Sequence, residues 1–169
     1  ALSLPQAMIS AVVSDTGPLI SFEKIEGGFS FLRKIVGTVF IPPQVYMELT
    51  AGFSADHSYF DHFGIADLVQ IVEAPLPPAA ANGLDEGERY AIALALSRGV
   101  PLLIEERLGR EVARQIGIPT SGAVGLLLSG WQDRLISSEE AGACLYGLLR
   151  AGRINRALLD MALARIQGH

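Results

Sequence analysis

The chain has 169 residues, of which 50% are hydrophobic and 18% charged, and this composition excludes an intrinsically disordered protein. A net charge of −5 argues against a protein that coats nucleic acid with a basic surface, and a single cysteine, Cys144, excludes a disulfide within the chain. No apolar run reaches the ~18 residues that span a bilayer, and residues 1–10 lack the basic segment of a secretory signal, so we expect a cytoplasmic protein without a membrane partner.

Short β-branched runs alternate along the chain with longer helical segments, which is the pattern of βαβ units around a parallel sheet. The pattern predicts strands at residues 11–15, 38–41, 68–72, 101–104 and, at an edge of the sheet, 118–120. It predicts helices at residues 19–25, 29–36, 44–51, 55–63, 86–98, 107–116, 122–131, 138–149 and 155–167. We therefore expect a lead-in at residues 1–10 and a single α/β domain at residues 11–169, with its core at about 11–130 and extra C-terminal helices at 138–167.

The helix at residues 86–98 has the most complete pattern, and Gly99 is predicted to end it. Its apolar residues cover most of its circumference, which predicts deep burial; they are Ala91, Ile92, Leu94, Ala95 and Leu96. Elsewhere, Thr16 is expected to cap the helix that follows the first strand, and Cys144 is expected to be a buried, inert thiol.

Acidic side chains follow two of the predicted strands at the point where each strand ends. Asp15 ends the first strand, and Glu105 and Glu106 follow the strand at residues 101–104. Ligands of parallel α/β sheets bind beyond the carboxyl ends of the strands, so these acids converge if the two strands are neighbours. Two helices add candidates, because Glu48 lies one turn into its helix and Glu88 lies in the first turn of the buried helix.

Such a cluster of carboxylates predicts a metal site. Clustered acids repel one another, and a divalent cation removes that repulsion. Mg²⁺ and Mn²⁺ prefer oxygen ligands, and such ions lower the pKa of a bound water and stabilise charge on a phosphate oxygen. The chemistry implied is hydrolysis of a phosphodiester. The three histidines are expected on the surface and not in a metal set: His57, His62 and His169.

Each acid also has an ordinary structural explanation. Asp15 could cap the helix after it, and Glu48 alone would more often be a solvated helix acid. The spacing Asp85-x-x-Glu88 is that of a capping box, in which Glu88 reaches back to the N–H of Asp85. Glu105, with the glutamate after it, could favour the positive end of a helix. The metal hypothesis therefore depends on several acids sharing one edge of the sheet.

Four segments of the chain follow one another in a recognisable order: DTGPLI at 15–20, IPPQVYMEL at 41–49, LDEGERYAIALA at 84–95 and LLIEER at 102–107. In this order they resemble motifs of the PIN-domain family, in particular a prokaryotic branch close to the VapC-like toxins. The resemblance covers about residues 11–130. It implies a three-layer α/β/α fold around a central, mostly parallel sheet. It also implies a Mg²⁺- or Mn²⁺-dependent endoribonuclease, often the toxin that pairs with an antitoxin protein.

The resemblance also implies roles for individual residues. Asp15, Glu48 and Glu88 correspond to the first three catalytic and metal-binding acids of the family. The fourth acid is usually Asp, and here that position is Glu105, with Glu106 as a further metal ligand. The alternative is a PIN-like scaffold that binds or regulates a partner and no longer cleaves RNA, which the change to glutamate and the negative net charge both favour.

Three arginines follow the last of these acids at helical spacing and could hold the phosphates of RNA: Arg107, Arg110 and Arg114. We assign Thr16 to the same substrate site. The equally weighted alternative for the arginines is a solvated helix face on which Arg110 neighbours Glu106 and Glu111.

The C-terminal helices carry more apolar residues than an isolated helical tail would expose, so they are expected to pack on the sheet or to form a homodimer interface. These residues are Ala143, Leu145, Leu148, Leu149, Leu158, Leu159, Ala162 and Leu163.

Overall fold

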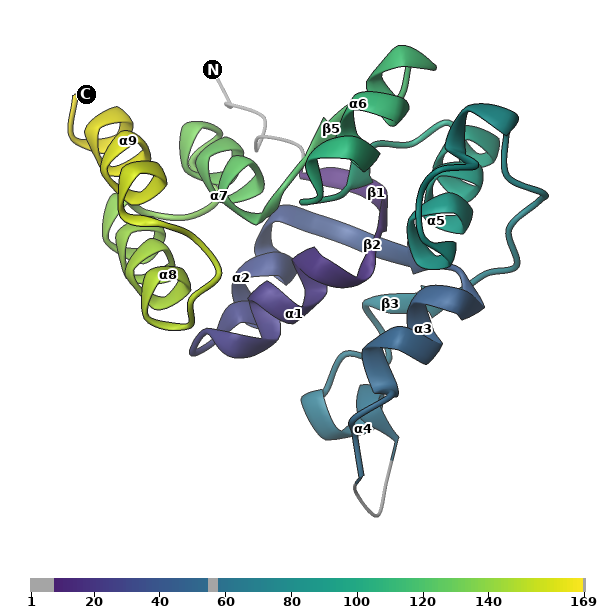
Figure 1. Ribbon diagram of the computed structural model, residues 1–169. Helices are drawn as coiled ribbons and strands as arrows, with labels where there is room; N and C mark the ends of the chain where they lie inside the picture. The colour runs from purple at the N-terminus through teal and green to yellow at the C-terminus, as the bar shows by residue number, and fades with distance from the viewer. Residues whose placement is uncertain (1–7, 55–57, 169) are drawn as a thin grey trace, which may run out of the picture. The chain divides into compact units, whose positions relative to one another are not determined.

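The computed structural model describes residues 8–54 and 58–168 (Figure 1). Its sheet has five strands in the order β3-β2-β1-β4-β5, and the pairs β1–β4, β2–β3 and β4–β5 are parallel. The strands are β1 (Ile9–Ser14), β2 (Val36–Ile41), β3 (Val69–Ile71), β4 (Leu102–Leu103) and β5 (Thr120–Ser121). The predicted α/β fold with a parallel sheet is confirmed, and the two strands that precede Asp15 and Glu105 are neighbours.

Helices connect the strands and continue beyond the last one. They are α1 (Thr16–Lys24), α2 (Gly28–Ile35), α3 (Pro43–Thr50), α4 (Tyr59–Phe63), α5 (Glu86–Arg98), α6 (Arg107–Gln115), α7 (Ala123–Gln132), α8 (Ser138–Arg150) and α9 (Arg156–Gln167), with a short 3₁₀ turn, η1, at Ala79–Ala81. No helix in the described part of the chain is both long enough and apolar enough to cross a membrane.

The described residues fall into two compact units. One, the sheet unit, contains residues 11–20, 38–54 and 58–122, and the other, the helical unit, contains residues 8–10, 21–37 and 123–168. The core of the sheet unit is made of fully buried strand residues such as Val12, Val39 and Leu102, against which α5 buries Ala91 and Ile92. This packing fixes the carboxyl ends of β1 and β4 beside the first turn of α5.

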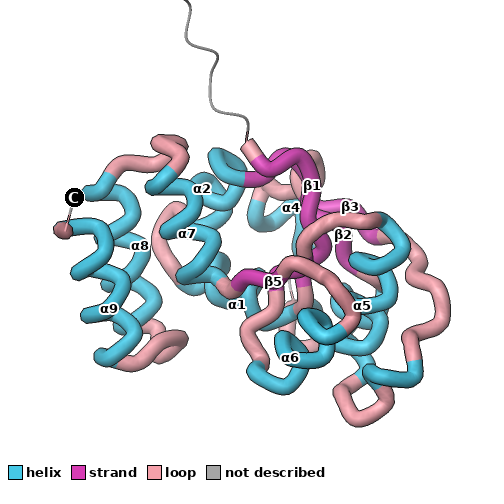
Figure 2. The backbone as a smooth tube through the Cα atoms, turned by 90° about the horizontal axis from the view of Figure 1, so that it is seen from above, coloured by secondary structure: helices cyan, strands magenta, loops and turns pink. Residues whose placement is uncertain are grey.

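In the helical unit α8 and α9 lie side by side, and α7 packs against both (Figure 2). A capping box starts α8, because Ser137 Oγ accepts from the N–H of Glu140 while Glu140 Oε1 accepts from the N–H of Ser137. Leu145 and Leu159 are fully buried here, and Cys144 is buried as expected. Burial raises the pKa of the Cys144 thiol to about 11, which favours an inert thiol.

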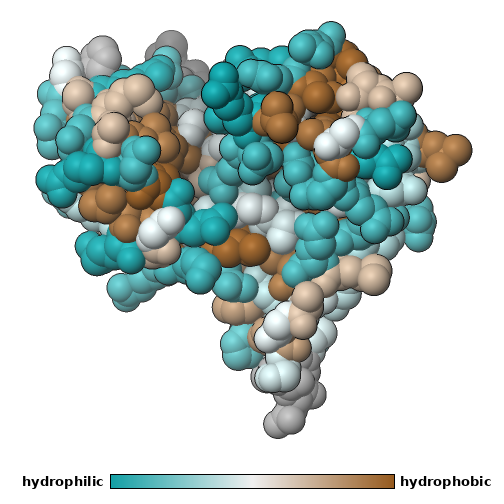
Figure 3. Space-filling model, in the orientation of Figure 1, coloured by the Kyte–Doolittle hydropathy of each residue, from teal (hydrophilic) through white to brown (hydrophobic). Residues whose placement is uncertain are grey.

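Not all apolar side chains of this unit are covered. Tyr146 is 43% exposed and Met161 is 62% exposed, and hydrophobic residues gather on the surface over α8 and α9 (Figure 3). Of the residues named from the sequence, Ala143 is also exposed, whereas Leu148 and Ala162 are buried. The helices therefore use most of their apolar residues for packing within the unit.

The structure corrects several predicted boundaries. The first strand begins at Ile9, and the fifth is shifted to Thr120–Ser121, because its partner is only Leu102–Leu103. The predicted helix at 55–63 is confirmed only at Tyr59–Phe63, since residues 55–57, with His57, lie outside the described residues, as does His169. In α5 the prediction for Leu96 was wrong, because it is 49% exposed and lies on the solvent side of the helix.

Candidate active site

Asp15 stands directly after β1, near the middle of the sheet. Its N–H donates to the carbonyl of Leu103, which continues the β1–β4 pairing by one residue. The residue is only 8% exposed, and its Oδ1 finds no hydrogen-bond partner among the described residues. Burial raises the pKa of Asp15 to about 7; a hydrogen bond from the Thr16 backbone acts against this rise, and the charges of Asp85, Glu48 and Glu105 add to it.

Glu48 lies on α3 and is solvent-exposed, yet both of its carboxylate oxygens are bonded. Thr16 Oγ1 donates to Oε2 at 2.7 Å, and the N–H of Gly87 donates to Oε1 at 3.2 Å. Glu48 is therefore exposed, as expected of a solvated helix acid, but two hydrogen bonds hold its carboxylate. The expectation that Thr16 caps the helix after β1 was wrong, because Thr16 is the first residue of α1 and its hydroxyl donates to Glu48 instead.

Glu88 lies in the first turn of α5 and is 6% exposed. Asp85 caps this helix, since its Oδ1 accepts from the N–H of Glu88 at 2.9 Å. Glu88 Oε2 is buried without a hydrogen-bond partner in the described part of the chain. Burial raises the pKa of Glu88 to about 8, and the carboxyl of Asp85, which shares a hydrogen bond with it, adds to the shift together with the charges of Asp15 and Glu106.

Glu105 and Glu106 connect β4 to α6. Glu105 is half-buried and its charge acts on Asp15, whereas Glu106 is exposed and its charge acts on Glu88. Glu106 stands at the N-cap of α6 but makes no capping hydrogen bond with its side chain. The structure thus brings the five acids predicted from the sequence into one electrostatic neighbourhood, in which each is linked to Asp15 or Glu88.

The position of this neighbourhood follows from the sheet topology. The chain runs from β1 to β2 and β3 on one side, and later adds β4 and β5 on the other side of β1. The strand order therefore reverses between β1 and β4, and ligands of open α/β sheets bind outside the carboxyl ends at such a switch point. Asp15 and Glu105 follow the two strands that flank it.

The fit of a divalent cation can be tested on these residues. Among residues 8–54 and 58–168, no three Asp, Glu, His or Cys side chains stand together as a ready ligand set. The donor chemistry nevertheless fits, because Asp15 Oδ1 and Glu88 Oε2 are buried carboxylate oxygens without partners and hard cations take such ligands. A cation would replace the protons that burial favours on both groups.

The three arginines predicted to bind substrate differ in their surroundings. Arg107 is 86% exposed at its side chain, and its Nε lies 3.5 Å from Glu111 Oε1. Arg110 is half-buried, and its Nε has no hydrogen-bond partner among the described residues. Arg114 is exposed.

Three residues of the site were not singled out as functional from the sequence. Asp85 was considered only as part of a capping box, although the same spacing places a further carboxylate beside Glu88. Gly87 and Gly109 have no side chain that a sequence pattern could reveal, and only the structure shows that the carboxylates of Glu48 and Glu88 lie close to them.

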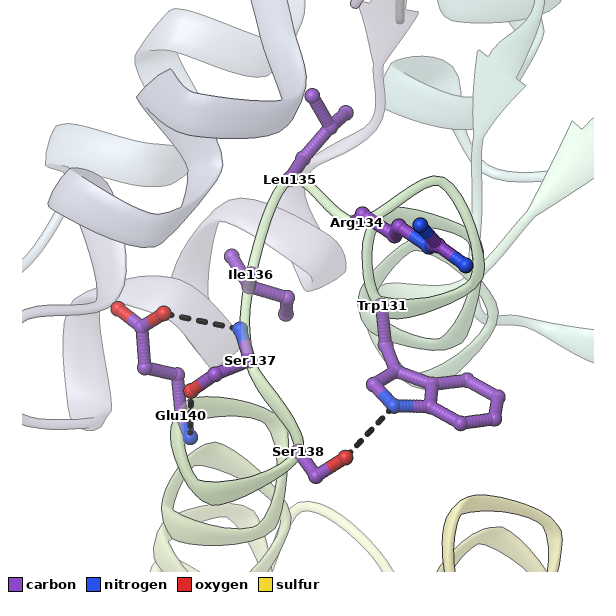
Figure 4. A pocket seen from close by; sticks show the side chains of 7 residues that line it. All are labelled: Trp131, Arg134, Leu135, Ile136, Ser137, Ser138 and Glu140. Carbon is purple, nitrogen blue, oxygen red and sulfur yellow. Dashed lines mark hydrogen bonds between the residues drawn. The ribbon is translucent and has the colours of Figure 1, made fainter. Parts of the chain in front are cut away.

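A shallow pocket of about 430 Å³ lies elsewhere in the chain, within the helical unit (Figure 4). It opens between Trp131 at the end of α7 and Ser138 at the start of α8, and Trp131 Nε1 donates to Ser138 Oγ at 2.9 Å. Its only acid is Glu140, which binds Lys34 Nζ at 2.6 Å. None of the acids predicted for the metal site lines this pocket.

A parallel sheet with buried carboxylates beyond the carboxyl ends of its strands is the arrangement of an α/β protein with a ligand site at the switch point. A family model described as DUF3368, PIN domain, matches residues 11–167, and the chain therefore belongs to the PIN-domain family. This match confirms the resemblance to the PIN-domain family that the sequence motifs indicated. PIN domains are in general nucleases that use divalent metal ions. No individually curated protein matches the chain.

Proposed function

We propose that the chain is a Mg²⁺- or Mn²⁺-dependent endoribonuclease that hydrolyses RNA phosphodiester bonds. The observation that supports it most is the pair of buried carboxylates, Asp15 and Glu88, whose unpartnered oxygens stand beside further acids at the switch point of the sheet. Two buried acids, each with one oxygen that has no hydrogen-bond partner among the described residues, are costly to ionise, and a metal site accounts for that cost.

In this proposal the acids have different roles. Asp15, Glu88, Glu105 and Glu106 supply oxygen ligands, and Glu48 is a ligand or an acid–base group that Thr16 and the helix α5 amide hold in one orientation. When bound, the metal ion lowers the pKa of a water molecule and stabilises negative charge on the scissile phosphate. Asp15 and Glu88 bind the proton in its absence, because their pKa values lie at about 7 and about 8.

Substrate contacts in this proposal come from Thr16 and from the arginines of α6. Arg110 supports it best, because its Nε has no hydrogen-bond partner among the described residues. Arg110 also follows Gly109 in the chain, and the backbone of Gly109 lies close to the carboxylate of Glu88. A guanidinium of this kind is suited to a phosphate oxygen. Arg107 and Arg114 are exposed on the same helix and extend the cationic surface for a longer RNA.

The proposal extends to partners and location. We place the chain in the VapC-like branch as the cytoplasmic toxin of a toxin–antitoxin pair, and treat residues 11–169 as one PIN-like domain. The exposed Tyr146 and Met161 on α8 and α9 support a homodimer through that face, which size-exclusion chromatography tests. A monomer at high protein concentration would exclude the dimer.

The test is a calorimetric titration with Mn²⁺ on the wild type, on Asp15→Asn and on the control Asp160→Asn, an exposed acid of α9. We expect binding in the wild type and the control, and none in Asp15→Asn. RNA cleavage that needs the metal and disappears in the same variant then establishes the nuclease. Binding that survives in Asp15→Asn would contradict the proposed site.

A second candidate is a PIN-like scaffold that binds a partner and does not cleave. Two observations favour it: glutamate stands at position 105, where the family usually has aspartate, and no three acids form a ready ligand set in the described chain. Mn²⁺ binding without RNA cleavage, or no binding in the wild type, would favour this candidate.

A further inference from the structure

Two acids of the site each occupy space that a glycine of another helix leaves open. A methyl group at Gly87 would lie 2.5 Å from Glu48 Oε1 and 2.7 Å from Glu48 Oε2, and one at Gly109 would lie 2.5 Å from Glu88 Oε2. α3 and α5, which carry Glu48 and Gly87, lie side by side (Figure 1). Each carboxylate therefore occupies the space that the Cβ of any residue other than glycine would need at that position.

We propose that Gly87 and Gly109 are positioning residues that hold the carboxylates of Glu48 and Glu88 in place by leaving them this space. The inference rests on the proposed function, because the exact position of a carboxylate matters most when it must coordinate a metal ion with strict geometry. Neither glycine is a ligand or reacts itself.

Backbone conformation does not explain these glycines. Gly87 and Gly109 lie inside α5 and α6, and neither is among the glycines with positive φ. Alanine is more favourable than glycine in a helix, so local stability alone would prefer alanine at both positions. The close approach of a carboxylate is the feature that requires a residue without Cβ.

Gly87 gives the clearer case of the two. The three atoms nearest to its added methyl all belong to the end of the Glu48 side chain, which is flexible and solvent-exposed. The fold can therefore accept alanine, but only if the carboxylate leaves its place against Thr16 Oγ1 and the Gly87 N–H. Alanine keeps that N–H, so the substitution removes the space for the carboxylate without removing the hydrogen-bond donor.

Gly109 needs one further change to isolate the same effect. Its added methyl would also meet Ile104 Cδ1 at 2.5 Å, and Ile104 is fully buried. Replacing Ile104 by valine deletes that methyl group, so the comparison of Ile104→Val with Ile104→Val/Gly109→Ala reports on the contact with Glu88.

The first experiment measures Mn²⁺ affinity by calorimetry for the wild type, Gly87→Ala and Gly142→Ala. Gly142 is the matched control, because it lies in α8 and, among the described residues outside its own helical turn, an added methyl there meets no atom within 4 Å. We expect Gly87→Ala to bind Mn²⁺ about 10- to 100-fold more weakly, which is the usual effect of mutating a residue that orients a metal ligand. The melting temperature of the metal-free variant should not fall. Wild-type affinity in Gly87→Ala would overturn the inference.

The second experiment needs no metal. Urea unfolding of wild type, Gly87→Ala, Glu48→Ala and the double variant forms a cycle that measures the coupling between the two positions. Once Glu48 is shortened, alanine at position 87 should stabilise the chain, and beside Glu48 it should stabilise less or not at all. Zero coupling would also overturn the inference.

The outcomes separate the two proposals. If the wild type binds no Mn²⁺ but positions 87 and 48 are coupled in stability, the proposed metal site fails and the positioning role of the glycine stands. If the wild type binds Mn²⁺ and Gly87→Ala binds it as tightly, the positioning role of the glycines fails and the metal site stands. Unchanged affinity in Ile104→Val/Gly109→Ala relative to Ile104→Val would exclude that role for Gly109.

Discussion

Asp15 and Glu88 set the energetics of the site at the scale of single residues. Each places a carboxyl group in the interior with one oxygen unpaired, and each lies near other acids. A buried acid without a cation favours its proton, which is why the pKa values rise to about 7 and about 8. The metal-free site therefore holds protons at neutral pH that an unfolded chain would release.

This difference predicts how stability depends on pH. Between about pH 4.5 and pH 7 the folded protein binds more protons than the unfolded chain, so the free energy of unfolding of the metal-free protein should fall as pH rises, and level off above about pH 8. Each group contributes a slope of at most about 1.4 kcal/mol per pH unit. Urea unfolding with a chelator at pH 5 and pH 8 measures it.

Asp15→Asn is the control for that prediction. It removes the group that titrates and keeps nearly the same shape, so it should match the wild type at pH 5 and exceed it at pH 8, by on the order of 2 kcal/mol. A wild type whose stability is constant or rises over this range would contradict the burial of these acids.

The candidate residues could be predicted from the sequence where an acid follows a strand or opens a helix, as Asp15, Glu105 and Glu88 do. Their bonds could not be predicted. The contact of Glu48 with Thr16 joins segments 32 positions apart, and that with Gly87 joins segments 39 apart. Such pairs depend on how α1, α3 and α5 pack, and a local pattern carries no information on it.

At the scale of elements, the first turn of α5 both forms a helix cap and contributes to the candidate active site. Asp85 caps it, its first-turn N–H groups bind Asp85 and Glu48, and its third residue is Glu88. Both acceptors are negative groups at the positive end of the helix, where the helix dipole favours them. The boundaries of this helix were predicted correctly, because Asp85 and Gly99 are strong local signals at its two ends.

The shortest strands were the least predictable elements. β4 contains only Leu102–Leu103, although the N–H of Ile104 still donates to the carbonyl of Ser121. Strand limits of this kind are decided by pairing between distant segments and not by the composition of the strand itself. The position of Glu105 just past β4 was nevertheless correct, since it depends on where the apolar run stops.

The cap of α5 can be separated from the charge of Asp85. Asparagine caps a helix about as well as aspartate, whereas alanine does not, so Asp85→Ala should be about 1 kcal/mol less stable than Asp85→Asn in urea unfolding. Both variants lose the same charge beside Glu88, so that contribution cancels in the comparison. Equal stability of the two variants would show that the bond from Glu88 N–H to Asp85 contributes nothing.

At the scale of the whole molecule, the strand order explains how acids from distant segments meet. β1 is central, with β2 and then β3 on one side and β4 and then β5 on the other. The chain must therefore complete most of the sheet unit before Asp15 acquires Glu88 and Glu105 as neighbours. The alternation of strands and helices predicted the fold class, but the reversal of strand order needed the structure.

This assembly leads to a prediction about metal binding and global stability. A cation that binds only the folded site stabilises it by RT ln(1 + [L]/Kd), about 2.7 kcal/mol at a hundred times Kd, which raises the melting temperature by roughly 5–10 °C for a chain of this size. The rise should be larger at pH 8 than at pH 5.5, because at the lower pH the ion must displace protons from Asp15 and Glu88. Thermal scans with and without millimolar Mn²⁺ measure both shifts, with Asp15→Asn expected to show neither. An equal rise at both pH values, or one that persists in Asp15→Asn, would place the ion on other groups, since only ligands that are protonated in the metal-free fold give this pH dependence.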